Sequence, residues 1–283
     1  MSLKHALIDR LSHIKWGEWS LISLYVSLIS GIVVGIHYNP AEPFYSASAL
    51  DILVPYGGYF RSLHFYSSQF FFLFGAVHYI LVFDKSRSLS PRAFSYLILC
   101  FPCALMLLFT GYVLRADTTG YSAGMIAEHI LETVPLVGHH LNNLLFAITD
   151  AGMYRVYLHH VISFDLLFLY LCWEHLRRYR ANFSGHLLFL AILMLFSLLI
   201  GAPMDPETLG VSYITGPWFF LGLQELLRYF NPFLAGIIVP ASLVAALLLL
   251  REEHRWFRRV LIGVLAWLGL YTMLTLAALT AHG

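Results

Sequence analysis

Long apolar runs recur along this chain and constrain its fold more than any other feature of the sequence. Most of them approach the roughly 20 residues that a helix needs to cross the hydrocarbon core of a bilayer. Because lipid satisfies no backbone polar group, each run is expected to be helical. We therefore predict an all-α integral membrane protein with about seven transmembrane helices. The expected spans are residues 20–38, 63–83, 93–113, 156–176, 186–202, 233–250 and 260–279.

The amino-acid composition supports a membrane protein. The chain has 283 residues, of which 59% are hydrophobic and 12% are charged. A soluble domain carries about twice that charged fraction. The formal net charge is only +1, far from the strongly basic balance of nucleic-acid-binding domains. We expect membrane lipid and protein partners, but no nucleic acid.

Lysine and arginine are distributed unevenly between the two sides that seven spans would define. Thirteen of the 17 fall on one side, and the positive-inside rule makes that side cytoplasmic. The N-terminus is then cytoplasmic and the C-terminus periplasmic, in a bacterial inner membrane or its equivalent. The segment Met1–Glu18 lacks the apolar core of a secretory signal and instead predicts an amphipathic helix on the membrane surface.

Four histidines form two widely spaced pairs inside the apolar segments. His64 and His78 lie at i and i+14 in the second span, and His160 and His175 at i and i+15 in the fourth. Each pair separates its rings by roughly 21–23 Å along a helix and returns to nearly the same face, off by roughly −40° and +60°. Both spans run inward, so His64 is expected to pair with His160 at the outer depth and His78 with His175 at the inner depth. Two such pairs suit two haem irons, each held by two imidazoles, on one electron path across the bilayer.

Other roles for these histidines compete with iron ligation. A single histidine on a membrane helix is more often a packed or hydrogen-bonded residue, but four ionisable residues at matched depths favour function. His159 is a rival for His160, although its i, i+16 relation to His175 places it roughly 160° from the face of that residue. The remaining histidines are expected at the two membrane surfaces, where a metal site of His139 and His140 is an open alternative.

Glycines and arginines near the histidines fit the same cofactors. Gly17 and Gly31 also lie at i and i+14, the interval of the first histidine pair. Glycine lets a helix backbone approach a flat macrocycle closely, and Gly111 in the third span offers the same. Arg61 and Arg155 precede the two outer histidines by three and five positions, and each is a candidate partner for a haem propionate. The alternative is that both are ordinary arginines of the membrane interface.

The chain divides near residue 182. Residues 1–182 contain four spans and all four candidate ligands, which predicts an N-terminal four-helix dihaem domain, and residues 183–283 contain three further spans. The predicted outer loops at 39–60, 114–154 and 203–230 are long, whereas the inner ones are short. A docking or substrate site is therefore expected on the outer loops.

Short motifs follow one another in order around the candidate ligands. They are Arg61-Ser62-Leu63-His64, then Thr110-Gly111-Tyr112 with Asp117 and Gly120-Tyr121, then Pro135-Leu136-Val137-Gly138, and Ser184-Gly185 after the fourth span. The first three resemble R-S-x-H, T-G-Y-S-L-P-W-D-Q-I-G-Y and P-V-I-G of cytochrome b from the quinol–cytochrome c and plastoquinol–plastocyanin reductase complexes. The wider spacing of the second histidine pair and Ser184-Gly185 resemble the plastid and cyanobacterial branch. The resemblance covers about residues 15–230.

The resemblance implies further properties of the chain. It implies two b-type haems with bis-histidine ligation, quinone or quinol as substrate, and an iron–sulfur or c-type cytochrome subunit on the outer side. It also implies a homodimer or larger complex. Residues 183–283 would then correspond to the C-terminal part of cytochrome b.

The segment that lines the outer quinol-oxidation site in this family is altered here. Trp218-Phe219-Phe220 resembles the end of the family's P-E-W-Y-F-F, but Gly216 and Pro217 stand in place of its Pro and Glu. That Glu accepts a quinol proton in the family, and a positioned carboxylate suits this task. The expected proton acceptor is therefore absent from its usual position.

Other residues are candidates for a modified quinone site. Glu225 has an alternative role, because it lies three positions before Arg228 and the two are expected to form an ion pair on one helix face. The sequence assigns no catalytic residue. The candidates are Asp117, Trp218, Phe219 and Glu225, with Glu207 as a further carboxylate.

These features predict an electron-transfer subunit of a quinol:cytochrome c oxidoreductase-like complex, in a respiratory or photosynthetic chain. It would carry electrons across the bilayer between quinone or quinol and a periplasmic-side redox partner. One alternative is a non-bifurcating transmembrane electron conduit of another quinone-linked oxidoreductase. An alternative of a different class is a haem-free helical transporter or structural membrane subunit.

Overall fold

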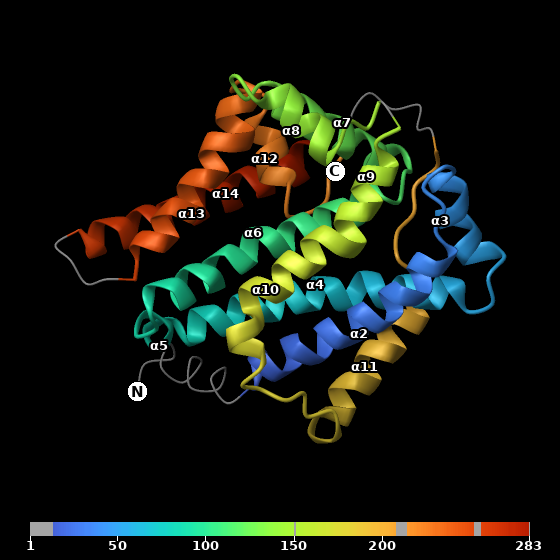
Figure 1. Cartoon of the computed structure of the whole chain (residues 1–283), viewed down its shortest axis with the longest axis horizontal. Coiled ribbons are helices and arrows are strands. Elements are labelled where there is room, and N and C mark those ends of the chain that lie inside the picture. The colour runs from blue at the N-terminus through green and yellow to red at the C-terminus, as the bar shows by residue number, and fades with distance from the viewer. Residues whose placement is uncertain (1–13, 150, 208–213, 252–255, 283) are drawn as a thin grey trace. The chain divides into compact units, whose positions relative to one another are not determined.

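The computed structural model describes residues 14–149, 151–207, 214–251 and 256–282, and within these ranges all regular structure is helical (Figure 1). The amphipathic surface helix expected over Met1–Glu18 lies largely outside them. The elements are α2 (Trp16–His37), α3 (Pro43–Ile52), α4 (Gly57–Leu81), α5 (Phe83–Arg87), α6 (Pro91–Val113), α7 (Thr118–Glu132), α8 (Gly138–Leu145), α9 (Met153–Leu158), the π turn η1 (His159–Ser163), α10 (Phe164–Leu176), the 3₁₀ turn η2 (Ser184–His186), α11 (Leu187–Leu199), α12 (Leu221–Leu226), the π turn η3 (Leu234–Ile238), α13 (Val239–Leu249) and α14 (Phe257–His282).

Four helices of the described residues are long and apolar enough to cross a membrane. They cover Trp16–His37, Pro91–Val113, Met153–Leu176 and Phe257–Thr280. The other predicted spans fall on α4, which has 25 residues, and on two shorter apolar helices, Ser184–Leu199 and Leu234–Leu249. The all-helical membrane architecture is therefore confirmed, and the count of seven stays a prediction.

The described helices group into two compact units that interleave along the chain. The first comprises residues 1–38, 48–89 and 173–203, and the second comprises 39–47, 90–172 and 204–283. The division predicted at residue 182 stays a prediction.

In the first unit, α2 packs along α4 and α11 packs on the same helix (Figure 1). The contacting face of α2 is lined by small polar side chains, Ser20, Ser23, Ser27 and Ser30, all buried. Small residues let two helix backbones approach closely, and the Ser20 hydroxyl donates to the backbone oxygen of Phe71 at 2.9 Å. This close approach positions the α2 glycines against α4.

In the second unit, α6 packs against α7, α9, η1 and α13, while α12 and α13 pack on α14. Ser90 caps the first turn of α6 by accepting from the backbone of Ala93 at 3.3 Å, and Pro91 occupies its first position. Asp117 caps α7 in the same manner. The expected outer loop 114–154 therefore contains two ordered helices, α7 and α8.

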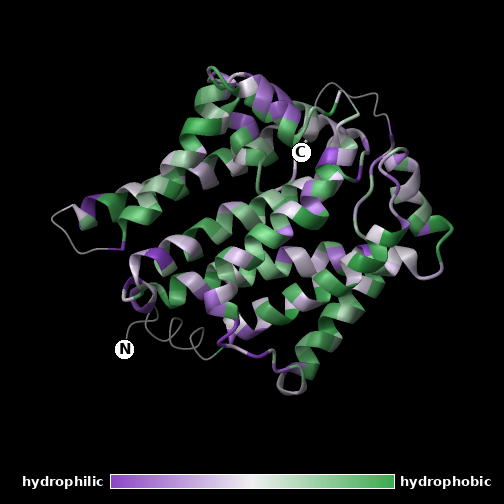
Figure 2. Cartoon of the chain, in the orientation of Figure 1, coloured by the Kyte–Doolittle hydropathy of each residue, from purple (hydrophilic) through white to green (hydrophobic). Residues whose placement is uncertain are grey.

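Figure 2 shows that hydrophobic residues dominate the apolar helices, as α11 shows clearly, and that hydrophilic residues are more frequent in the short helices and connecting segments. On α14, Leu265, Leu268 and Met273 are all exposed. Exposed apolar side chains along a helix of this length are what contact with lipid requires.

Candidate functional site

His64 lies on α4 in the first unit, facing α2. Its Nδ1 is 2.9 Å from the backbone oxygen of Ser27 and 3.3 Å from the Ser27 hydroxyl. Because a carbonyl oxygen only accepts, Nδ1 carries the ring proton and Nε2 carries the lone pair that a metal requires. A Cβ placed on Gly31 would lie 2.8 Å from Cε1 of His64. The α2 backbone therefore contacts the imidazole edge only because residue 31 is glycine.

His78 and His175, the pair predicted at the inner depth, both belong to the first unit and lie close together. Their ring centroids are 6.2 Å apart, with ring planes at 51°. Two imidazoles that each bind the same metal ion, through bonds of about 2 Å, would have their ring centres at a similar separation. The spacing of these two residues therefore fits one metal ion held between them. A Cβ on Gly17 would lie 3.0 Å from Cε1 of His78, which repeats the relationship of Gly31 to the other ligand on α4.

His160 lies in the second unit, on η1, and its ring contacts α6. Nδ1 is 3.0 Å from the hydroxyl oxygen of Thr110. That hydroxyl donates to the backbone oxygen of Met106 at 2.7 Å, so its oxygen accepts from His160. Nδ1 again carries the proton and Nε2 the lone pair. A Cβ on Gly111 would lie 3.0 Å from Cε1 of His160.

The helix that carries His160 contains a π turn, η1, near its start. A π turn closes its hydrogen bond one residue later than an α turn, so it takes up one position of the interval between His160 and His175. The number of α-helical steps then matches the i, i+14 interval of His64 and His78, for which about 100° per residue gives a shared face. The unequal spacings are therefore equivalent in the helix.

His159 occupies the same π turn but uses both ring nitrogens elsewhere. Its Nε2 lies 2.8 Å from the backbone oxygen of Leu144, and its Nδ1 lies 3.0 Å from the hydroxyl of Ser163. The carbonyl fixes Nε2 as the donor, so Nδ1 accepts from Ser163. This engagement disfavours His159 as a metal ligand and agrees with the preference for His160.

The structure does not test every pairing that the sequence predicts. His64 belongs to the first unit and His160 to the second, so their pairing stays a prediction. Among the described residues, no three His, Cys, Asp or Glu side chains form a metal-ligand group. His139 and His140 have ring centroids 6.2 Å apart, and Nδ1 of His139 lies 3.3 Å from Glu132.

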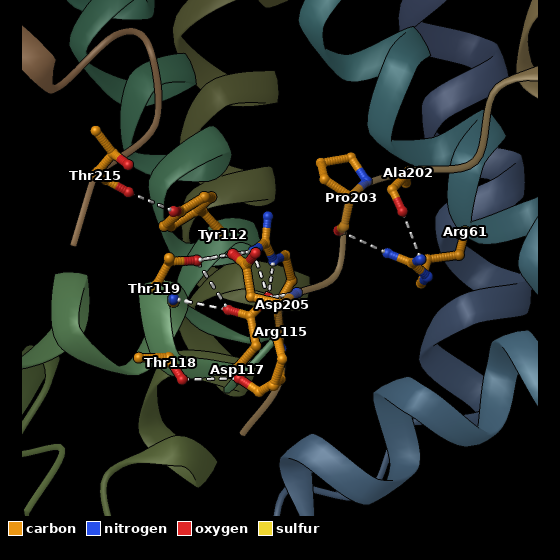
Figure 3. A network of polar contacts seen from close by, with 12 residues as sticks. Arg61, Tyr112, Arg115, Asp117, Thr118, Thr119, Ala202, Pro203, Asp205 and Thr215 are labelled. Carbon is orange, nitrogen blue, oxygen red and sulfur yellow. Dashed lines mark hydrogen bonds and ion pairs between the residues drawn. The ribbon is translucent and has the colours of Figure 1, made fainter. Parts of the chain in front are cut away.

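Arg61, a candidate propionate partner, is engaged by protein groups of the first unit (Figure 3). Its Nε and Nη2 donate to the two carboxylate oxygens of Asp51 at 2.7 and 2.5 Å. Nη2 also reaches the backbone oxygen of Ala202 at 2.8 Å, and Nη1 that of Pro203 at 3.3 Å. The guanidinium therefore joins the start of α4 to the end of the segment after α11. The role of Arg155, at the start of α9, as a partner of a haem propionate stays a prediction.

Asp117 lies at the centre of a polar network in the second unit (Figure 3). It is fully buried. One carboxylate oxygen accepts from the backbone of Gly120 at 2.8 Å, and the other accepts from Nε of Arg115 at 2.9 Å and from the backbone of Asp205 at 2.8 Å. Arg115 also donates to the Asp205 carboxylate at 3.2 Å, and Thr119 donates to it at 2.8 Å. Asp117 thus caps α7 and is neutralised by Arg115.

The other candidate quinone-site residues lie mostly on or just before α12. Glu225 is buried and forms the expected ion pair with Arg228 at 3.2 Å, while Tyr229 donates to it at 3.0 Å. The indole of Trp218 is half exposed, and Phe219 is buried. Glu207, further from α12 in the chain, is exposed and accepts from Tyr45 at 3.4 Å.

Four further residues contribute to these sites although the sequence assigned them no role there: Ser27, Asp51, Asp205 and Thr110, which was named only as part of a motif. Ser27 had a signal, because it belongs to the regular stripe of small residues on α2. Thr110 lies beside Gly111, but its partner on η1 is 50 residues away. Asp51 and Asp205 are bound by Arg61 and Arg115, respectively. These contacts depend on how the chain packs, and no local sequence pattern indicates them.

Comparison with known proteins supports the same family as the motifs. A family model described as Cytochrome b/b6/petB matches residues 9–181. The cytochrome b6 of Heliomicrobium gestii is 28% identical over 153 residues, which cover 52% of this chain and 72% of the relative. The cytochrome b of Chondrus crispus is 24% identical over an alignment of 318 residues, covering 91% of this chain and 82% of the relative.

A similarity of fold accompanies the similarity of sequence. A chain of a solved structure described as a hyperthermophilic respiratory Complex III matches with a TM-score of 0.70 at 19% identity, covering 92% of this chain and 83% of that chain. The family model covers more than half of the present sequence, and the glycine–histidine contacts lie within the matched part. The chain therefore belongs to the cytochrome b family.

Proposed function

We propose that this chain is the membrane cytochrome b subunit of a bc-type complex. It would hold two b-type haems, each between two histidines, with His64 and His160 at the outer depth and His78 and His175 at the inner depth. When bound, the haems supply the one-electron carriers between quinone or quinol and an outer iron–sulfur or c-type cytochrome subunit. The protein side chains hold and orient these groups and exclude water around them.

The observation that best supports this proposal is the spacing of the inner pair. The 6.2 Å between the ring centroids of His78 and His175 leaves room for one iron between two imidazoles. The hydrogen bonds of His64 and His160 add a second line of support, since both fix the proton on Nδ1. Ligating histidines characteristically donate their other ring N–H to a protein acceptor.

Topology and domain organisation belong to the same proposal. Seven spans would place the N-terminus in the cytoplasm and the C-terminus in the periplasm. Residues 1–182 would form the dihaem four-helix domain, and residues 183–283 would contribute three helices to the complex. The uneven distribution of lysine and arginine supports this orientation.

The ion pairs of the two buried carboxylates in the candidate quinone site favour a second version of the function. Pro217 stands where the family has its proton-accepting Glu. Asp117 is buried against Arg115, and Glu225 is buried against Arg228, so both carboxylates already neutralise a cation. This arrangement favours a non-bifurcating electron conduit, in which quinone reacts at one site and a periplasmic partner docks on the outer loops.

A reduced-minus-oxidised spectrum of the purified full chain tests the proposal. We expect a b-type α-band and two haems per chain. Leucine at His78 or at His175 is expected to remove the same single haem, while His159→Leu, the matched control, keeps both. A chain without a b-type band, or with a single haem, would contradict the proposal and favour a haem-free transporter or structural subunit.

The two versions are separated by adding quinol together with an inhibitor of the inner site. A bifurcating complex is expected to reduce its haems only when an oxidised outer partner is present. Haem reduction that is independent of the outer partner is the result expected of a simple conduit.

A further inference from the structure

The contact between Thr110 and His160 has a direction that the geometry fixes. The Thr110 side chain is buried, with 1% of its surface exposed. Its hydroxyl has one proton, and two backbone oxygens of its own helix lie within reach, those of Met106 at 2.7 Å and Leu107 at 3.2 Å. Carbonyl oxygens cannot donate, so the hydroxyl proton goes to the helix and the hydroxyl oxygen accepts from Nδ1 of His160 at 3.0 Å.

A hydroxyl that donates to a carbonyl is polarised and becomes a better acceptor. The chain from His160 through Thr110 to Met106 therefore draws Nδ1–H away from the imidazole ring. This increases electron density at Nε2, the ligating nitrogen. A stronger donor stabilises the oxidised, more positive form of a bound iron over the reduced form.

The corresponding contact on the other outer ligand differs in chemistry. Nδ1 of His64 donates to the backbone oxygen of Ser27 at 2.9 Å, and the Ser27 hydroxyl is more distant at 3.3 Å. Side-chain substitution can remove the acceptor of His160, whereas it leaves the main acceptor of His64 in place. The ring proton of His160 is therefore held by a side chain, whereas that of His64 is held mainly by the backbone.

We propose that Thr110 is a positioning residue for the outer haem, which fixes the ring tautomer of His160 and lowers the reduction potential of the iron that it would bind. The inference rests on the proposed dihaem function. Both haems would have two histidine ligands, so the identity of the ligands does not decide which haem is reduced less readily. The inference assigns that difference to the hydroxyl of Thr110.

Thr110→Val tests this proposal, because valine keeps the branched shape and removes the hydroxyl. The full chain in detergent or nanodiscs is titrated potentiometrically at the b-type α-band, so that the readout is independent of turnover. We expect one haem to be reduced more readily, with its reduced-to-oxidised ratio at fixed potential rising about tenfold, or ~59 mV for one electron. The second haem should not shift, and Thr110→Ser should restore the wild-type potential.

Ser163→Ala is the matched control, because it alters the partner of His159 on the same π turn and leaves the contact between Thr110 and His160 in place. This variant is not expected to shift either potential. Equal potentials in Thr110→Val and the wild type, with both haems retained, would overturn the proposal, as would an equal shift in Ser163→Ala.

Haem retention gives a second readout if the valine variant binds poorly. Loss of one haem in Thr110→Val and Thr110→Ala, with retention in Thr110→Ser, supports the role of the hydroxyl through affinity. Loss in all three variants, including serine, would overturn it and indicate a packing role. A wild-type chain without any b-type band contradicts the proposed function itself, and that outcome is distinct from all the others.

Discussion

Gly17 on α2 lies directly against the imidazole of His78, at a position that has no room for a side chain. A Cβ at position 17 would lie 3.0 Å from Cε1 and Nδ1 of that ring, closer than ordinary van der Waals contact. The backbone of α2 thereby forms one wall beside the ring, and the same relationship links Gly31 to His64 at another level of the same two helices. The equal intervals of the two pairs place both contacts on one helix face.

Valine at Gly17 is therefore expected to displace the His78 ring. Overpacking of a tight contact costs about 1–3 kcal/mol, which corresponds to about 5- to 150-fold in affinity for whatever the ring holds. We expect the inner haem to be lost or weakly held in Gly17→Val, measured as haem per chain by the α-band. Gly269→Val on α14 is the matched control, because nothing lies within 4 Å of its added Cβ. Equal haem content in both variants would contradict the prediction that a side chain at position 17 displaces His78.

How far the sequence predicts these sites depends on the range of each interaction. The glycines of α2 and the histidines of α4 share an i, i+14 interval, and a shared interval on two helices is visible in the sequence. The ion pair of Glu225 with Arg228 is also local, at i and i+3. Such short-range regularities follow from helix geometry alone.

Interactions between distant segments were not predictable in the same way. The π turn at His159–Ser163 has no local composition signal, so the sequence did not show why the interval from His160 to His175 is one residue longer than that from His64 to His78. Thr110 and His160 are 50 residues apart, and their contact depends on how α6 packs against η1. The length of apolar runs does not predict the helices within residues 114–154, because α7 and α8 are shorter and more polar than a membrane span.

Asp51 is expected to stabilise the first unit through Arg61. The Arg61 side chain is 11% exposed, and its guanidinium donates two hydrogen bonds to the Asp51 carboxylate. Hydrogen bonds to charged groups contribute about 1.5–3 kcal/mol. Asp51→Asn should therefore lower the free energy of unfolding by about 2 kcal/mol, measured by thermal or denaturant unfolding followed at the α-band.

The same variant tests the propionate role predicted for Arg61. If its main partner is Asp51, the haem potentials of folded Asp51→Asn stay at their wild-type values. A shift in one potential, with stability unchanged, would instead indicate that the guanidinium interacts chiefly with a haem.

Glu128 on α7 is expected to make α7 and α8 sensitive to acid. Burial alone would raise the pKa of Glu128, but hydrogen bonds from Asn142 and Thr149 outweigh it and hold that pKa below its ordinary value of 4.5. A carboxyl whose pKa is lower in the folded state contributes stability above about pH 4.5 and loses it as the pH falls through the folded value. The protection factors of α7 and α8 against hydrogen exchange, which correct for the pH dependence of the intrinsic exchange rate, should therefore fall on acidification in the wild type.

Glu128→Gln provides the comparison for this pH dependence. Glutamine can still accept from Thr149, whose hydroxyl lies 2.9 Å from Glu128, but it does not titrate. We expect the protection factors in this variant to change less between about pH 6 and pH 3.5. An identical acid response in the variant and the wild type would assign the effect to other groups.

Asp117 is expected to be structural rather than a quinol-proton acceptor. It accepts from two backbone N–H groups and from Arg115 while fully buried. Asparagine would leave the guanidinium without its buried counter-charge, at a cost of about 3–5 kcal/mol. Asp117→Asn should therefore lower the unfolding temperature strongly, whereas Thr118→Ala, which removes one exposed hydrogen bond to Pro206, should lower it slightly. An Asp117→Asn chain with wild-type stability, both haems and slowed quinol oxidation would instead assign the proton-accepting role to Asp117.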